Sequence, residues 1–272
     1  TMDINRPFGS ICSDEHFAAA CKIGEEGIVL LQNNNNVLPI DLNQVKKIAV
    51  IGENAVKMMT VGGGSSSLKV KHEISPLDGI RKRVGNKAEV VYARGYVGDV
   101  GGDYNGVSSG QNLKDDRSPE ELIAEAVEVA KSADCVIFIG GLNKSDFQDC
   151  EGSDRKELGL PYGQDKVIEA LVKANKNLVV VNISGNAVAM PWVKEVPAIM
   201  QAWYLGSEAG TAIASVLVGD TNPSGKLPFT FPVSLEDVGA HKLGEYPGVA
   251  RNDGSDIVDV KYNEGIFVGY RY

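Results

Sequence analysis

The chain alternates between short apolar runs and longer segments in which apolar residues recur every three or four positions. Five runs rich in Val and Ile read KIAVIG, AEVVYA, CVIFIGG, LVVVNIS and AIMQAWY, and they begin at Lys47, Ala88, Cys135, Leu178 and Ala198. Continuous apolar runs of this length are typical of strands that are covered on both faces. The residues expected to build the core are Ile48, Val50, Val136, Phe138, Val179, Val181 and Ile199.

Three of the intervening segments have the spacing of amphipathic helices. Residues 119–132 place five apolar side chains on one face, and Ser118 precedes them as a suitable N-cap. Residues 164–174 and 207–217 show the same periodicity. Alternation of buried strands with such helices predicts an α/β three-layer sandwich, in which helices cover both faces of a mostly parallel β-sheet.

Two polar segments interrupt this alternation. Residues 98–117 are rich in Gly, Asp, Asn and Ser, and residues 238–256 are rich in Gly, Asp and Pro. Each is expected to be a long loop. Loops of more than about 12 to 15 residues in a compact domain are often functional. Both are therefore candidates for the rim of a substrate site or for contact with another domain.

Composition narrows the classes of partner. The 272 residues carry a net charge of −9, and no clustered Lys and Arg suggest contact with nucleic acid or an anionic membrane. No apolar run approaches the roughly 18 residues of a membrane span. The four cysteines lack CxxC spacing and are accompanied by three histidines, which favours neither a zinc site nor a disulfide scaffold. No metal or cofactor is indicated, and a neutral substrate fits best.

Ligands of open α/β sheets bind beyond the carboxyl ends of the strands, which directs attention to the loop after KIAVIG. This loop contains GGGSSS at residues 62–67, where glycines permit close approach of the backbone and serines offer hydroxyls. A nucleotide-binding domain is one interpretation. Neither GxGxxG nor GxxxxGK[ST] is present, however, so phosphate binding is disfavoured. A flexible turn is the simpler alternative.

The loop after CVIFIGG is crowded with carboxylates, namely Asp146, Asp149, Glu151, Asp154 and Glu157. Like charges and partial burial disfavour ionisation and raise the pKa of a carboxyl, as a general acid at neutral pH requires. Arg155 is expected to keep a neighbouring carboxylate charged. From composition alone, a solvated acidic surface loop is the favoured interpretation.

Taken together, the motifs resemble the second domain of family-three glycoside hydrolases of the β-glucosidase type. The similarity is colinear over nearly the whole chain: EEGIVLLQNNNNVLPI, KIAVIGENA, GGGSS, SPLDGI, EGSDRKELGLPYGQ, SGNAVAMPWV, AWYLGSEAGTAIASVLVGDTNPSGKLPFTFP and YNEGIFVGYRY. The GSEAGTAIASVL and PSGKLPFTFP segments are the most diagnostic. Any one motif can arise by chance, but their common order is specific.

The resemblance implies a retaining hydrolase in which a preceding barrel domain supplies an aspartate nucleophile. Glu151 matches the family's general acid/base, and Asp154 and Arg155 match the residues that follow it. Ser65 and Ser66 would lie on the loop that approaches the sugar. In retaining enzymes the two carboxyl groups stand about 5 to 5.5 Å apart.

The expected organisation is therefore a linker leading into the domain (residues 1–26) and an α/β-sandwich domain (residues 27–272), with the barrel absent and the C-terminal end truncated. The expected substrate is a β-linked oligosaccharide or glucoside with a terminal β-D-glucosyl residue. The alternatives are a β-xylosidase of the same family and a domain that only binds carbohydrate or braces the barrel. The isolated chain is expected to be inactive. By family analogy, the protein is expected to be secreted or periplasmic.

Overall fold

The protein is described by a computed structural model that covers residues 3–98 and 107–271. Its centre is a six-stranded sheet with the strand order β1-β6-β5-β4-β2-β3. All neighbouring pairs are parallel except β1 and β6, which are antiparallel. The strands are β1 (Val29–Asn33), β2 (Lys47–Ile51), β3 (Glu89–Ala93), β4 (Cys135–Gly141), β5 (Leu178–Ile183) and β6 (Ala198–Gln201).

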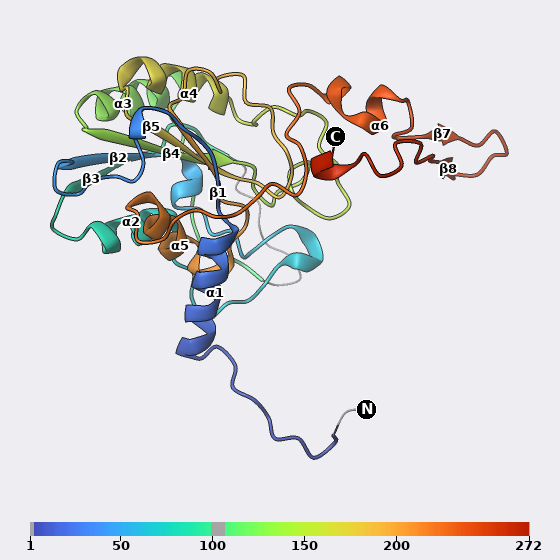
Figure 1. Ribbon diagram of the computed structural model, residues 1–272, viewed down its shortest axis with the longest axis horizontal. Helices are drawn as coiled ribbons and strands as arrows, with labels where there is room; N and C mark the ends of the chain where they lie inside the picture. The colour runs from blue at the N-terminus through green and yellow to red at the C-terminus, as the bar shows by residue number, and fades with distance from the viewer. Residues whose placement is uncertain (1–2, 99–106, 272) are drawn as a thin grey trace.

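Helices cover both faces of the sheet, which confirms the predicted three-layer sandwich (Figure 1). On one face α3 (Pro119–Lys131) packs beside α4 (Gln164–Ala174). On the other, α2 (Pro76–Val84) packs against α5 (Ala209–Leu217), and α1 (Asp14–Gly27) lies against α5. The mostly parallel sheet is therefore protected from water on both sides, as its uninterrupted apolar strands require.

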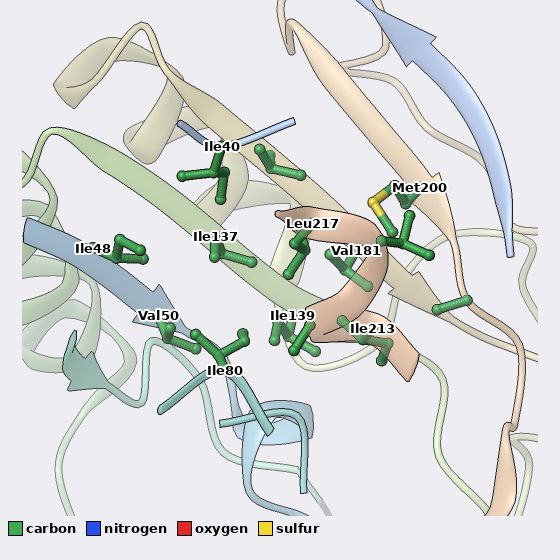
Figure 2. Close-up of a cluster of buried hydrophobic side chains, with 14 of the residues drawn as sticks. Ile40, Ile48, Val50, Ile80, Ile137, Ile139, Val181, Met200, Ile213 and Leu217 are labelled. Carbon is green, nitrogen blue, oxygen red and sulfur yellow. The ribbon is translucent and has the colours of Figure 1, made fainter. Parts of the chain in front are cut away.

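Two apolar clusters fill the spaces between the layers. Alternate side chains of each strand point to opposite faces, so Ile48, Val50, Val179 and Val181 pack towards α2 and α5. Figure 2 shows part of this cluster, with Ile80 of α2 and Ile213 and Leu217 of α5 against the strands. The predicted core residues of the other cluster, which packs with α3 and α4, are Val136, Phe138 and Ile199. All seven predicted core residues are fully buried.

The local signals for the helices hold in the structure. Ser118 caps α3 in a capping box with Glu121, and α4 has the predicted bounds. The last predicted helix is shorter, because residues 206–208 form a 3₁₀ turn before α5 begins at Ala209. Within the sandwich, α1, β1 and α2 were not predicted. Of these, α1 begins inside the segment 1–26 that was expected to be a linker.

The two segments that were expected to be loops differ from one another. Within residues 98–117, positions 99–106 lie outside the described residues. The segment 238–256 is not a simple loop, because it contains the short helix α6 (Gly239–Lys242) and the strand β7 (Val249–Ala250). β7 pairs with β8 (Val258–Asp259) in a hairpin that projects away from the sandwich (Figure 1). Backbone pairing across β7 and β8 provides the order that composition alone did not reveal.

Two further findings concern residues 3–98 and 107–271. None of their helices is long and apolar enough to span a lipid bilayer. Within the same ranges, no three His, Cys, Asp or Glu side chains gather closely enough to hold a metal ion.

Candidate active site

Two loops meet at the carboxyl edge of the sheet. β2 and β4 are parallel neighbours, so the segments that follow them emerge side by side. We call residues 62–67 the glycine–serine loop and residues 142–163 the acidic loop. The Gly63 N–H donates to the Lys144 carbonyl over 2.8 Å, and the Glu151 N–H donates to the Gly63 carbonyl over 3.2 Å. The two loops singled out in the sequence are thus joined through their backbones.

Glu151 lies at the tip of a tight turn in the acidic loop. An antiparallel bridge between Cys150 and Ser153 closes the turn, and Gly152 adopts a left-handed φ of 80° within it. Glu151 itself is exposed. Glu151 therefore stands on an exposed loop at the carboxyl edge of the sheet, whereas its catalytic role stays a prediction.

The carboxylate of Glu151 faces the glycine–serine loop. The Ser65 N–H donates to Glu151 Oε2 over 2.7 Å. A Cβ added to Gly64 would lie 2.6 Å from Glu151 Cβ and 2.8 Å from Oε2, and Gly64 has a φ of 82°. Both the space and the backbone conformation therefore require glycine at this position. Ser66 points elsewhere, since its hydroxyl donates to the carbonyls of Gly62 and Gly63.

The pKa of Glu151 differs from the expectation based on crowded carboxylates. Hydrogen bonds from the Ser65 side chain and then from its backbone N–H lower the pKa of Glu151 below its ordinary value. Because Asp146, Asp154 and Glu157 are also exposed, water separates these charges, and crowding does not raise this pKa.

Asp154 and Arg155 border a hollow of about 520 Å³ beside the turn. Arg155 forms no ion pair with a carboxylate within the described residues, and its expected effect on the charge of a neighbouring carboxylate stays a prediction. Its guanidinium donates instead to the backbone carbonyls of Ala187, Leu158 and Glu157, at 2.9, 3.1 and 3.3 Å. Asp154 is exposed and has no hydrogen bond or ion pair with the rest of the described chain. Arg155 thus shapes the wall of the hollow, whereas Asp154 is free to meet a ligand.

A buried ion-pair network supports the segment after β2. Glu53 is 1% exposed and accepts hydrogen bonds of 2.7 Å from both Arg94 and the Gly98 N–H. Arg94 also lies 3.6 Å from Asp115, whose second partner is Arg117 at 2.7 Å. Because burying Glu53 without a cation would be costly, this network anchors the chain just before the glycine–serine loop.

Comparison with known proteins places this arrangement in a family. The profile of the Glycosyl hydrolase family 3 C-terminal domain matches residues 28–270. The chain belongs to glycosyl hydrolase family 3. Over its full length it is 49% identical to a β-glucosidase of Bacteroides ovatus and covers 35% of that protein. It is 36% identical to a β-xylosidase of Formosa agariphila, with 84% of this chain and 29% of that protein covered.

Solved structures agree with the sequence relatives. The crystal structure of the family 3 β-glucosidase of Bifidobacterium adolescentis superposes with a TM-score of 0.77 at 34% identity, covering 97% of this chain and 34% of that one. The family 3 domain described here therefore spans about a third of the length of these relatives. The resemblance inferred from the ordered motifs is confirmed.

One polar cluster of this family 3 domain was not predicted as a site. Asp149 Oδ2 accepts hydrogen bonds from Tyr204 at 2.9 Å and the Gly185 N–H at 2.7 Å, and Oδ1 accepts one from Asn186 at 2.5 Å. Burial and the adjacent Asp149 carboxylate raise the pKa of Tyr204, so the phenol stays protonated as a donor. These residues tie the acidic loop to the segments after β5 and β6. Asp149 was noticed only as one of several acidic residues.

Proposed function

We propose that this family 3 domain supplies Glu151 as the general acid/base of a retaining β-glucosidase. The observation that supports the proposal is the position of Glu151, which is exposed at the tip of a turn in the acidic loop and bonded to the glycine–serine loop. A proton donor must reach a bond held by another part of the enzyme, and an exposed carboxyl on a braced loop meets this requirement.

In the proposed reaction, an aspartate of a preceding barrel domain attacks the anomeric carbon, while Glu151 protonates the departing glycosidic oxygen. Glu151, now a carboxylate, then removes a proton from the water that attacks the covalent glycosyl-enzyme. The hydrogen bonds from Ser65 stabilise this second, charged form. Exposed Asp154 and the loop hydroxyl of Ser65 are proposed to contact the sugar or its leaving group, whereas the Ser66 hydroxyl is bonded to Gly62 and Gly63 within its own loop.

A β-glucoside is the preferred substrate, because the relative with the higher identity, at 49% over the full chain, is a β-glucosidase. β-Xyloside hydrolysis is the second candidate, favoured by the 36% identity to a β-xylosidase. Turnover of nitrophenyl β-glucoside and β-xyloside by the full-length protein compares the two. A higher kcat/KM on the xyloside would reverse the preference.

Nucleotide binding is disfavoured by how the glycine–serine loop uses its amides. The N–H groups of Gly62, Gly63 and Ser65 already donate to the Ser67 hydroxyl, the Lys144 carbonyl and Glu151, respectively. A phosphate cradle needs such N–H groups to converge on an anion. We therefore expect NAD and ATP to leave the melting temperature of the chain unchanged, and a rise would revive the nucleotide-binding interpretation.

The decisive experiment replaces Glu151 by Ala in the full-length protein. We expect kcat/KM to fall by about 10² to 10⁴-fold on substrates with poor leaving groups, the range typical of general acid–base catalysis. The fall in kcat/KM should be smaller on activated aryl glycosides, and azide should partly restore their turnover. Asp146→Ala is the matched control, because it removes another exposed carboxylate of the same loop.

Normal turnover by Glu151→Ala would contradict the acid/base assignment and favour the alternative in which the domain only binds carbohydrate or braces the barrel. An equal loss in Asp146→Ala would point to general disturbance of the acidic loop. Export of the protein is a separate part of the proposal and rests on family analogy alone. Fractionation of the producing cells tests it, and retention in the cytoplasm would contradict it.

A further inference from the structure

We infer that the glycine–serine loop is a positioning element for the acid/base, in which Ser65 holds the carboxylate of Glu151 and Gly64 makes room for it. This inference rests on the proposed role of Glu151 and adds a named partner to it. An exposed glutamate otherwise samples many rotamers. The 2.7 Å hydrogen bond from the Ser65 N–H fixes one of its oxygens.

The donor is itself held in place from both sides. The Gly63 N–H donates to the Lys144 carbonyl over 2.8 Å, and the Lys144 ammonium donates to the Ser66 carbonyl over 3.2 Å. Inside the loop, the Gly62 N–H donates to the Ser67 hydroxyl over 3.0 Å. Ser65 is therefore presented to Glu151 by a loop whose position is fixed by the start of the acidic loop.

The close approach depends on Gly64. Any side chain there would place its Cβ 2.6 Å from Glu151 Cβ, well inside van der Waals contact. Glu151 also contacts this loop through its own backbone, since its N–H donates to the Gly63 carbonyl over 3.2 Å. Two hydrogen bonds in opposite directions thus bind Glu151 to Gly63 and Ser65, on either side of Gly64.

This arrangement has a chemical consequence. A charge-assisted hydrogen bond to a carboxylate stabilises its ionised form, so it favours both loss of the proton to the leaving group and the charged state that later activates water. Two other charged side chains beside the turn have different partners: Lys144 donates to the Ser66 carbonyl, and the Asp149 oxygens bond Tyr204, Gly185 and Asn186. Ser65 is therefore the residue placed to stabilise the ionised form of the Glu151 carboxyl.

The test uses the full-length protein with Ser65→Ala, which removes the hydroxyl, and Ser65→Pro, which also removes the backbone N–H. Loss of these donors should raise the pKa of Glu151, so the alkaline limb of the kcat/KM profile on an aryl β-glucoside should move to higher pH. The shift should be larger for Ser65→Pro. Ser66→Ala is the matched comparison, because that hydroxyl bonds Gly62 and Gly63 instead, and it should leave the limb where the wild type has it.

Melting temperatures establish that each variant is folded. A folded Ser65→Pro protein with the wild-type alkaline limb would overturn the inference; if Ser65→Pro does not fold, an unshifted limb in Ser65→Ala would do so. An equal shift in Ser66→Ala would also overturn it, by showing that any change in the loop has this effect. Impaired turnover by Glu151→Ala alongside unshifted Ser65 variants would refute only this inference, whereas normal turnover by Glu151→Ala would remove the acid/base proposal itself.

Discussion

The crossing of α2 and α5 offers a sharp test of the packing, because two glycines bring the helix backbones together. A Cβ added to Gly79 of α2 would lie 2.1 Å from the carbonyl oxygen of Gly210 in α5. The reverse substitution at Gly210 would place a Cβ 2.0 Å from the Ser75 carbonyl oxygen. The Gly210 N–H also donates to the Ile74 carbonyl over 2.9 Å. Gly79→Ala is therefore predicted to force the helices apart.

The expected cost follows from the overlap. Even close C–H···O contacts have carbon–oxygen distances of about 3.3 Å, so a 2.1 Å approach requires local separation by about 1.2 Å. Overpacking costs roughly 1–3 kcal/mol, and the upper end applies because a backbone carbonyl cannot rotate away. The higher helix propensity of Ala offsets this cost by about 1 kcal/mol. The net loss in the free energy of unfolding is therefore about 2 kcal/mol, or roughly 4–8 °C in melting temperature.

The assay is thermal unfolding of the purified chain, followed by circular dichroism and calorimetry. Gly27→Ala is the matched control, since Gly27 is the last residue of α1 and an added Cβ would meet nothing within 4 Å. It makes the same chemical change in a helix and should leave the melting temperature nearly unchanged. If Gly79→Ala had the same melting temperature as Gly27→Ala, the close crossing of α2 and α5 would be refuted.

Two further predictions concern activity and pH. The isolated chain should fold but show no Glu151-dependent turnover of nitrophenyl β-glucoside, because a proton donor without a nucleophile or a sugar pocket does not complete the retaining reaction; substantial turnover abolished by Glu151→Ala would contradict this. Hydrogen bonds from Arg117 lower the pKa of Asp115 from 3.8 to about 2, so its contribution to stability is present above pH 3.8 and is lost as the pH falls through about 2. The difference in melting temperature between wild type and Asp115→Asn should therefore shrink from pH 5 to pH 2, and a constant difference would refute the linkage.

Local signals in the sequence determined most of the sandwich. The apolar runs of β2 to β6 and the 3.6-residue periodicity of α3 and α4 predict which residues are buried, because each pattern lies within a single segment. Ser118 and Glu121 likewise form a cap within four residues. The ordered motifs also identified the family. The short edge strand β1 was missed, because most of its residues are only half-buried and a register shift interrupts its pairing with β6, so no alternation of apolar and polar residues marks it.

The candidate site was only partly predictable. The sequence singled out Glu151 and Ser65, but their hydrogen bond joins residues 86 positions apart and exists because β2 and β4 are neighbours in the sheet. The carboxyl groups of the acidic loop looked alike in the sequence. Only the tertiary structure turned Asp149 towards Tyr204, 55 positions away, and left Glu151 exposed. Residue chemistry is local, whereas the pKa and role of a carboxyl depend on which distant donors the fold brings to it.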